Sequence, residues 1–160
     1  MKRICRYLQG TKDNGLVFNP YKKLVVDCYA DADFAGLWGY EDPRDPIYAR
    51  NRPGFVVTFS NFPLLWVSKL QTEIALSTLH SEYVAFSHSV RALITLKSLI
   101  KEVIDNLGID SDNLKFVSSS TIYEDNNGVI FVATSTRITP SSKHIAIKYN
   151  WFRQHVERNL

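Results

Sequence analysis

The chain has 160 residues, of which 45% are hydrophobic and 22% are charged, and this composition excludes a disordered chain. Its length suits one domain with a sizeable core, and its two cysteines, Cys5 and Cys28, exclude a disulfide framework or a four-sulfur zinc site. The formal net charge of +3 permits a polyanionic partner but does not require one.

The first half of the chain is predicted to hold one short helix and four strands. Residues 2–9 form a basic helix that Gly10 ends. The strands follow at 16–20, 24–36, 54–60 and 63–69, and Asn61 and Phe62 form a hairpin turn between the last two. The proline-rich, mixed-charge stretch 38–54 is predicted to be a surface loop, with Trp38 exposed on it.

The second half is predicted to be mainly helical. Apolar residues at spacings of three and four predict a helix from Thr78 to about Leu107, with Gly108 as its stop. The stripe consists of Tyr83, Phe86, Val90, Leu93, Leu96, Ile100, Val103 and Leu107. A strand over 114–123, a short helix through 129–133 and an amphipathic helix over 144–158 complete the order, with Trp151 and Phe152 in the core. This order indicates an α/β fold, a mixed sheet with helices packed on it.

Three acidic residues stand near the ends of predicted elements. Asp31 lies on the second strand, Glu82 near the start of the long helix, and Asp125 after the last strand. Clustered carboxylates bind hard Mg²⁺ ions, and two such ions about 4 Å apart can activate water and stabilise a leaving oxygen. Each acid also has a local explanation, as a turn residue, a first-turn helix acid or a helix cap. Spacing alone favours these local explanations, because it does not show that the three residues meet.

Five sequence phrases in series carry a family resemblance. They are YADADFAG, RNRPGFVVTF, LLWVSKLQTEIALSTLHSEYVAFS, YEDNNGVIFVA and SSKHIAIKYNWFRQHV. In this order and spacing, the chain resembles the ribonuclease H domain of copia-type LTR retrotransposons from about residue 2 to 158. The opening KRICRYLQGTKDNGL is similar to the segment that joins reverse transcriptase to that domain. The resemblance implies a connector at 1–20 and a ribonuclease H-like domain at 21–160, whose mixed sheet carries packed helices.

The resemblance also implies an activity, which is metal-dependent hydrolysis of the RNA strand of RNA–DNA hybrids during retrotransposon reverse transcription. Asp31, Glu82 and Asp125 match the family's metal-binding acids, so Mg²⁺, or Mn²⁺ in its place, is the implied cofactor. Asp33 shares the strand parity of Asp31 and ranks below it. The implied partners are the hybrid and the rest of the reverse transcriptase polyprotein. The chain shows no signal-peptide pattern and no bilayer-length apolar run, which predicts an intracellular protein, in a cytoplasmic particle or the nucleus.

Two departures from the family pattern bear on this activity. His80 stands where the family has a glutamate three residues after a serine, here Ser77, so one bond of a capping box is lost. His80 is predicted to belong to a surface cap, with a proton carrier near the metal cluster as the alternative. The family's fourth aspartate, in an A-D-x-x-T-K phrase, has no match before Leu160, and the family's C-terminal strand or helix is predicted to be missing. The alternative function is therefore a catalytically impaired or domesticated remnant that acts as a nucleic-acid-binding or scaffold module.

Basic residues near the C-terminus predict a surface that binds the hybrid. Lys143, Lys148 and Arg153 are the candidate phosphate contacts. Such contacts give affinity and salt dependence without base specificity.

Overall fold

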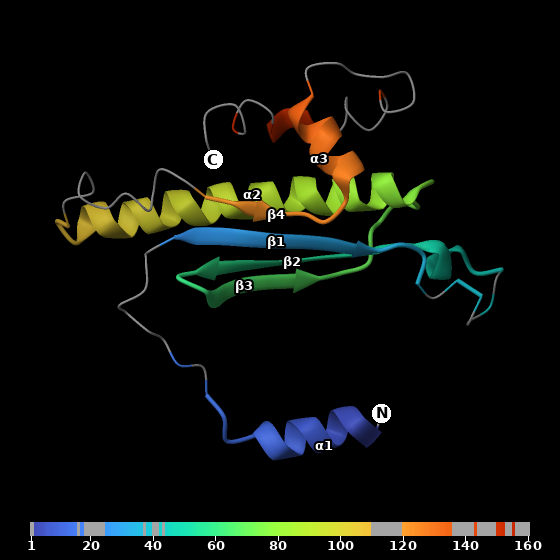
Figure 1. Ribbon diagram of the computed structural model, residues 1–160, viewed down its shortest axis with the longest axis horizontal. Helices are drawn as coiled ribbons and strands as arrows, with labels where there is room; N and C mark the ends of the chain where they lie inside the picture. The colour runs from blue at the N-terminus through green and yellow to red at the C-terminus, as the bar shows by residue number, and fades with distance from the viewer. Residues whose placement is uncertain are drawn as a thin grey trace.

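The chain folds around a four-stranded mixed sheet that the long helix α2 (Thr78–Asn106) crosses on one face (Figure 1). The computed structural model describes residues 2–15, 17, 25–36, 38–39, 42, 44–109, 120–135, 143, 150–152 and 155. The strand order is β3-β2-β1-β4, for β3 (Phe62–Ser68), β2 (Arg52–Phe59), β1 (Val26–Asp33) and β4 (Ile122–Tyr123). This α/β architecture confirms the predicted mixed sheet with packed helices and is compatible with a ribonuclease H-like fold.

The pairing of β1 with its neighbours sets the geometry of the sheet. β1 runs antiparallel to β2 along its whole length and parallel to β4, where Cys28 pairs with Ile122 and Tyr29 with Tyr123. The rings of Tyr29 and Tyr123 stack with centroids 4.6 Å apart. Alternate residues of β1 are buried toward α2 and exposed on the opposite face, as a strand with one covered face requires.

The helix α2 has the predicted limits. The Ser77 hydroxyl oxygen accepts a hydrogen bond from the His80 backbone N–H at 3.1 Å, and Gly108 ends the helix with φ of +65°. The predicted apolar stripe is wrong at its C-terminal end, where Val103 and Leu107 are 49% and 67% exposed and Ile104 is buried instead. An α-helix turns 3.6 residues per turn, so positions spaced by three and four drift off the buried face over a long helix.

Two hydrophobic clusters lie on opposite sides of α2. One, between the helix and the sheet, contains Val26, Cys28, Val57 and Leu93. The other joins α2 to α3 (Asn127–Thr134) and to the 3₁₀ turn η4 (Asn150–Phe152), and contains Tyr83, Phe86, Val90, Val129, Val132, Ala133 and Phe152. Phe152 is fully buried and Trp151 packs beside it, which confirms the predicted core role of both.

Several predicted boundaries are wrong by a residue or two. Helix α1 (Lys2–Thr11) runs through Gly10, and the Thr11 hydroxyl closes its last turn by donating to the Tyr7 carbonyl. The hairpin turn is Ser60–Asn61, one residue earlier than predicted, because both residues adopt the positive φ that such a turn needs. The predicted loop contains a short 3₁₀ helix, η1 (Pro46–Ala49), and its end belongs to β2, whereas Trp38 is exposed as predicted.

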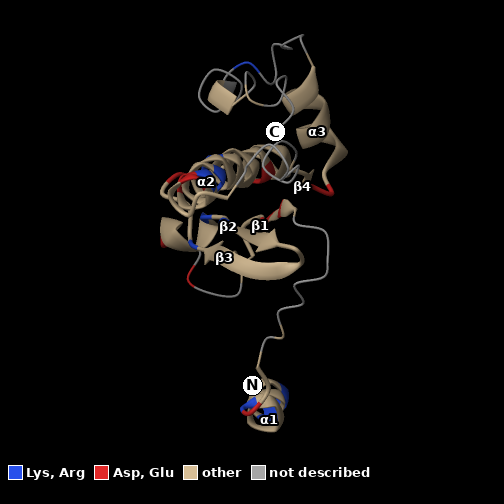
Figure 2. Ribbon diagram, turned by 90° about the vertical axis from the view of Figure 1, so that its left-hand side faces the viewer, with Lys and Arg blue, Asp and Glu red and all other residues tan. Residues whose placement is uncertain are grey.

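Other predictions fall largely outside the described residues. These are the strand at 16–20, the start of the strand at 114–123 and most of the helix at 144–158. Of that helix, residues 150–152 form the 3₁₀ turn η4, and residue 155 is α-helical. Helix α1 has no buried residue and stands apart from the sheet in both views (Figures 1 and 2). The domain boundary at residue 20 stays a prediction. None of the described helices combines the length and apolar character needed to cross a membrane.

The two cysteines are expected to differ sharply in reactivity. Cys28 is fully buried, and burial raises its pKa to about 12, whereas Cys5 is exposed on α1. The thiolate is the reactive form, so one thiol per chain is expected to react with Ellman's reagent under native conditions and the second only after denaturation in guanidinium. The Cys5→Ser variant is the control and should show no fast-reacting thiol. Two fast thiols in the native wild-type chain would contradict the packing of β1 against α2.

Candidate carboxylate site

The three predicted acids come from three elements that meet at one end of the sheet. Asp31 lies on the exposed face of β1, and Asp125 follows β4 directly, where the chain turns toward α3 (Figure 2). β1 and β4 are parallel neighbours, so their carboxyl ends lie at the same edge. Both aspartates line one cavity of about 500 Å³, together with Tyr29, Ala30, Ile122, Tyr123 and Glu124.

Glu82 reaches this edge from the second turn of α2. Its side chain is 6% exposed, and its carboxylate accepts a hydrogen bond from the backbone N–H of Ala32, next to Asp31. Burial in the first place, and then the negative charges of Asp31 and Asp125, raise the pKa of Glu82 to about 7. The structure thus brings the three predicted residues into one electrostatic cluster.

A fourth carboxylate, Glu124, belongs to the same cluster and was missed from the sequence. Its Oε1 atom accepts a hydrogen bond from the Asn126 backbone N–H at 3.1 Å. Its pKa is raised to about 7, first by burial and then by the charges of Glu82, Asp125 and Asp31. The signal in the sequence was the Glu-Asp pair in YEDNNG, but the family resemblance drew attention to the aspartate alone.

The donor chemistry of this cluster fits a hard divalent cation. The Oε2 atoms of Glu82 and Glu124 are buried and have no hydrogen-bond partner among the described residues. Buried carboxylate oxygens without partners are costly, and an oxygen-only donor set is the kind that Mg²⁺ and Mn²⁺ prefer. Within the described part of the chain, no three His, Cys, Asp or Glu side chains are close enough to hold one ion as they stand. Repulsion between like charges favours this spread arrangement, and a divalent cation would favour a tighter one.

Asp33 and His80, the two lower-ranked candidates, have other contacts. The Asp33 carboxylate lies against Gly36, where a Cβ atom would overlap it. Asp33 is not among the charges that raise the pKa of Glu82, which are those of Asp31 and Asp125. His80 is partly buried, and its backbone N–H donates to the Ser77 hydroxyl at the start of α2; this bond does not involve the imidazole, so the surface-cap role of the side chain stays a prediction.

A buried amide network joins the elements that carry the carboxylates. Asn51 is fully buried, and its Oδ1 atom accepts from the Ala35 backbone N–H at 2.8 Å, just after β1. Its Nδ2 atom donates to Oε1 of Gln71 at 3.3 Å. The Nε2 atom of Gln71 in turn donates to the carbonyl of Ser81 at 3.2 Å, one residue before Glu82. This network was also missed, because Asn51 and Gln71 lie in polar stretches that look like ordinary loops.

The predicted phosphate contacts are described only in part. Lys143 is exposed, as a phosphate-binding residue must be. Lys148 and Arg153 lie outside the described residues.

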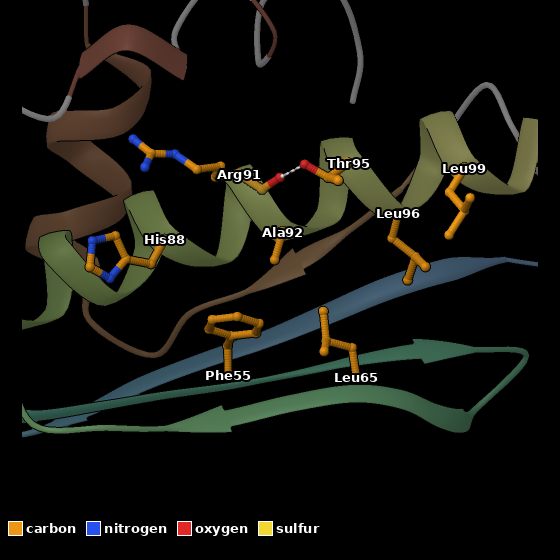
Figure 3. Close-up of a pocket in the computed structure, with 8 residues that line it drawn as sticks. All are labelled: Phe55, Leu65, His88, Arg91, Ala92, Thr95, Leu96 and Leu99. Atoms are coloured by element: carbon orange, nitrogen blue, oxygen red, sulfur yellow. Dashed lines mark hydrogen bonds between the residues drawn. The ribbon is translucent and has the colours of Figure 1, made fainter.

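A second hollow, of about 540 Å³, lies between α2 and the strands β2 and β3 (Figure 3). Figure 3 shows Phe55 and Leu65 rising from the sheet toward Ala92 and Leu96 of the helix. The other lining residues are His88, Arg91, Thr95 and Leu99. This groove is mainly apolar and shares no lining residue with the carboxylate cavity.

Comparisons with known proteins point to retroelements. The retrovirus-related Pol polyprotein from transposon TNT 1-94 of Nicotiana tabacum is 31% identical over 98% of this chain. The corresponding polyprotein from transposon RE1 of Arabidopsis thaliana is 30% identical over the same share. The chain is similar to one stretch of retrovirus-related Pol polyproteins. That stretch is 10% of each relative, so the chain spans about a tenth of the length of these curated proteins.

A shorter similarity leads to a protein with a different description. The secreted RxLR effector protein 161 of Plasmopara viticola is 32% identical over 96 residues, which cover 60% of this chain and 62% of that protein. No protein family's sequence profile matches the chain, and no solved structure matches it.

Proposed function

We propose that this chain is a nuclease domain of a retrotransposon polyprotein that hydrolyses the RNA strand of RNA–DNA hybrids with Mg²⁺ or Mn²⁺. The observation that carries the proposal is the cluster of Asp31, Glu82 and Asp125 beside one cavity. The five sequence phrases and the similarity to Pol polyproteins over 98% of the chain support it.

The three carboxylates of the proposed site differ in burial. When bound, a pair of divalent ions supplies an activated water and stabilises the leaving oxygen. Asp31 and Asp125 are exposed at the cavity, so their oxygens would be accessible to bound divalent ions. Glu82 is buried behind them and is held in place by the Ala32 N–H. A cation bound nearby would favour the ionised form of Glu82 and so would lower its pKa, against the effect of burial.

Binding of the hybrid is proposed to rest on the basic residues near the C-terminus. Lys143, Lys148 and Arg153 would contact phosphate oxygens, which gives affinity for any sequence. Recognition of the RNA strand requires contacts to its 2′-hydroxyl groups, because these distinguish RNA from DNA. The rest of the polyprotein is the proposed covalent partner.

The test is a cleavage assay with a labelled RNA–DNA hybrid. We expect the RNA strand to be cut with Mg²⁺ or Mn²⁺ and to stay intact with EDTA. A DNA duplex of the same sequence should stay intact under all of these conditions. Asp31→Asn should slow cleavage at least ~100-fold, the usual effect of removing one electrostatic stabiliser of a transition state. Asp105→Asn, exposed near the end of α2, is the matched control and should keep full activity. Hybrid binding without any cleavage would instead favour the scaffold alternative.

A further inference from the structure

The carboxylate cluster has two layers. Around β4, Tyr123 and Asp125 are exposed, whereas Ile122 and Glu124 are partly buried. This alternation separates Glu124 from Asp125 and places it on the covered side, as it does Ile122, which packs in both hydrophobic clusters against α2. Glu82 is buried in the same layer, since it belongs to α2 itself. The two aspartates are therefore the exposed members of the cluster and Glu82 is its buried member, whereas Glu124 is partly buried and lines the same cavity as the aspartates.

Each glutamate has one satisfied oxygen and one unsatisfied oxygen. Glu124 accepts from the Asn126 N–H through Oε1, and Glu82 accepts from the Ala32 N–H. The Oε2 atom of each is buried and has no partner among the described residues. Glu82 is 6% exposed, so water does not compensate its free oxygen. Buried carboxylate oxygens without a partner are costly in free energy, so a cation or a proton at these oxygens would stabilise the cluster.

We propose that Glu124 is a fourth ligand-bearing carboxylate of this site and that its free oxygen, together with that of Glu82, binds a divalent cation. The proposal rests on the metal site of the proposed function and adds to it a residue that the family resemblance does not assign. A cation bound between the two glutamates would give both free oxygens a partner, and oxygen atoms of carboxylates are its preferred ligands. The hydrogen bonds from Asn126 and Ala32 fix the remaining oxygens and so orient both side chains.

The test is a calorimetric titration of the full 160-residue chain with MnCl₂ at pH 8, in the absence of nucleic acid. Glu124→Gln keeps the shape of the side chain but removes its charge, and it should raise the Kd for Mn²⁺ by about tenfold to a hundredfold. Glu124→Asp, which keeps the charge, should recover part of this loss. Glu102→Gln, exposed on α2, is the matched control and should bind as the wild type does. Circular dichroism checks that each variant is folded.

The outcomes separate this inference from the proposed function. Unchanged Mn²⁺ affinity in Glu124→Gln, alongside a loss in Asp31→Asn, would overturn the role of Glu124 and leave the three-acid site standing. Absence of Mn²⁺ binding by the wild type would overturn both. Loss of Mn²⁺ affinity in Glu124→Gln, in a chain that does not cleave the hybrid, would support the metal ligand and reject the nuclease.

Discussion

The Glu82→Gln variant is expected to be more stable than the wild-type chain at pH 8 without divalent cations, and to cleave RNA–DNA hybrids at least ~100-fold more slowly. The reason is that burial, and after it the charges of Asp31 and Asp125, raise the pKa of Glu82 to about 7. Glutamine has the same shape and can still accept the Ala32 hydrogen bond, but it carries no charge. Replacing this proposed metal ligand therefore also removes a buried, repelled charge.

The stability gain of Glu82→Gln should depend on pH in a defined direction. The pKa of Glu82 rises from its ordinary 4.5 to about 7 on folding, so between these values the folded chain holds a proton that the unfolded chain releases. The wild type therefore loses stability as pH rises from 4.5 to 7. The stability advantage of Glu82→Gln over the wild type correspondingly disappears as pH falls from 7 to 4.5. At ~1.4 kcal/mol per pKa unit, and allowing for solvent screening, we expect a gain of about 1–2 kcal/mol above pH 7.

Urea unfolding at pH 4.5, 6 and 8 in EDTA measures this difference. Glu102→Gln, at an exposed site on α2, is the control for the loss of one negative charge. Added Mg²⁺ should raise the stability of the wild type more than that of Glu82→Gln, because the ligand stabilises the state that binds it. A Glu82→Gln chain less stable than wild type at pH 8 would show that the Glu82 charge is already compensated within the fold.

The Asn51→Ala variant is expected to lower the free energy of unfolding by about 2–3 kcal/mol. Asn51 is fully buried, and its removal leaves the Ala35 N–H and the Gln71 Oε1 atom without their partner. Gln71 then loses part of the support that fixes it against Ser81. Because Ser81 precedes Glu82, cleavage should fall as well, even at temperatures where the variant is fully folded.

Denaturant unfolding of Asn51→Ala measures the loss, and Asn106→Ala is the matched control. Asn106 donates to the Glu102 carbonyl, but that bond is exposed, so its removal should change the free energy of unfolding by less than ~0.5 kcal/mol. Equal stabilities of the two variants would mean that the buried amide network contributes nothing to the fold.

Local patterns predicted the fold where they were long and regular. The apolar, β-branched run at 24–36 and the stripe of α2 are properties of neighbouring residues, so the sequence indicates both elements. The run suggests a strand covered on both faces, but β1 spans only Val26–Asp33 and has one covered face. The predicted stripe of buried residues is wrong only from Val103 onward, where small deviations in periodicity accumulate. The turn at Ser60–Asn61 was displaced because either register gives a two-residue loop, and backbone twist selects between them.

The site was predictable only as far as the family resemblance reached. It marked Asp31, Glu82 and Asp125, whose charges the structure brings together. Glu124 could not be predicted in this way, because its burial depends on the pairing of β4 with β1 and on the cover of α2. The contacts of Asn51 likewise join segments that are distant in the sequence, and no local pattern reports them.

The parallel pairing of β4 with β1 has a consequence for how the protein acquires its site during synthesis. The backbone N–H of Thr121 donates to the Asp27 carboxylate across 94 positions of sequence, and Cys28 donates to the Thr121 carbonyl beside it. Contacts of such high sequence separation form late in folding, since a long loop must close before they exist. The hairpin β2–β3 and the helix α2 are expected to assemble with β1 before residues 121–125 dock. A chain in which residues 121–125 have not yet docked would therefore contain a folded sheet and helix but an incomplete carboxylate cluster, because Glu124 and Asp125 lie in that segment.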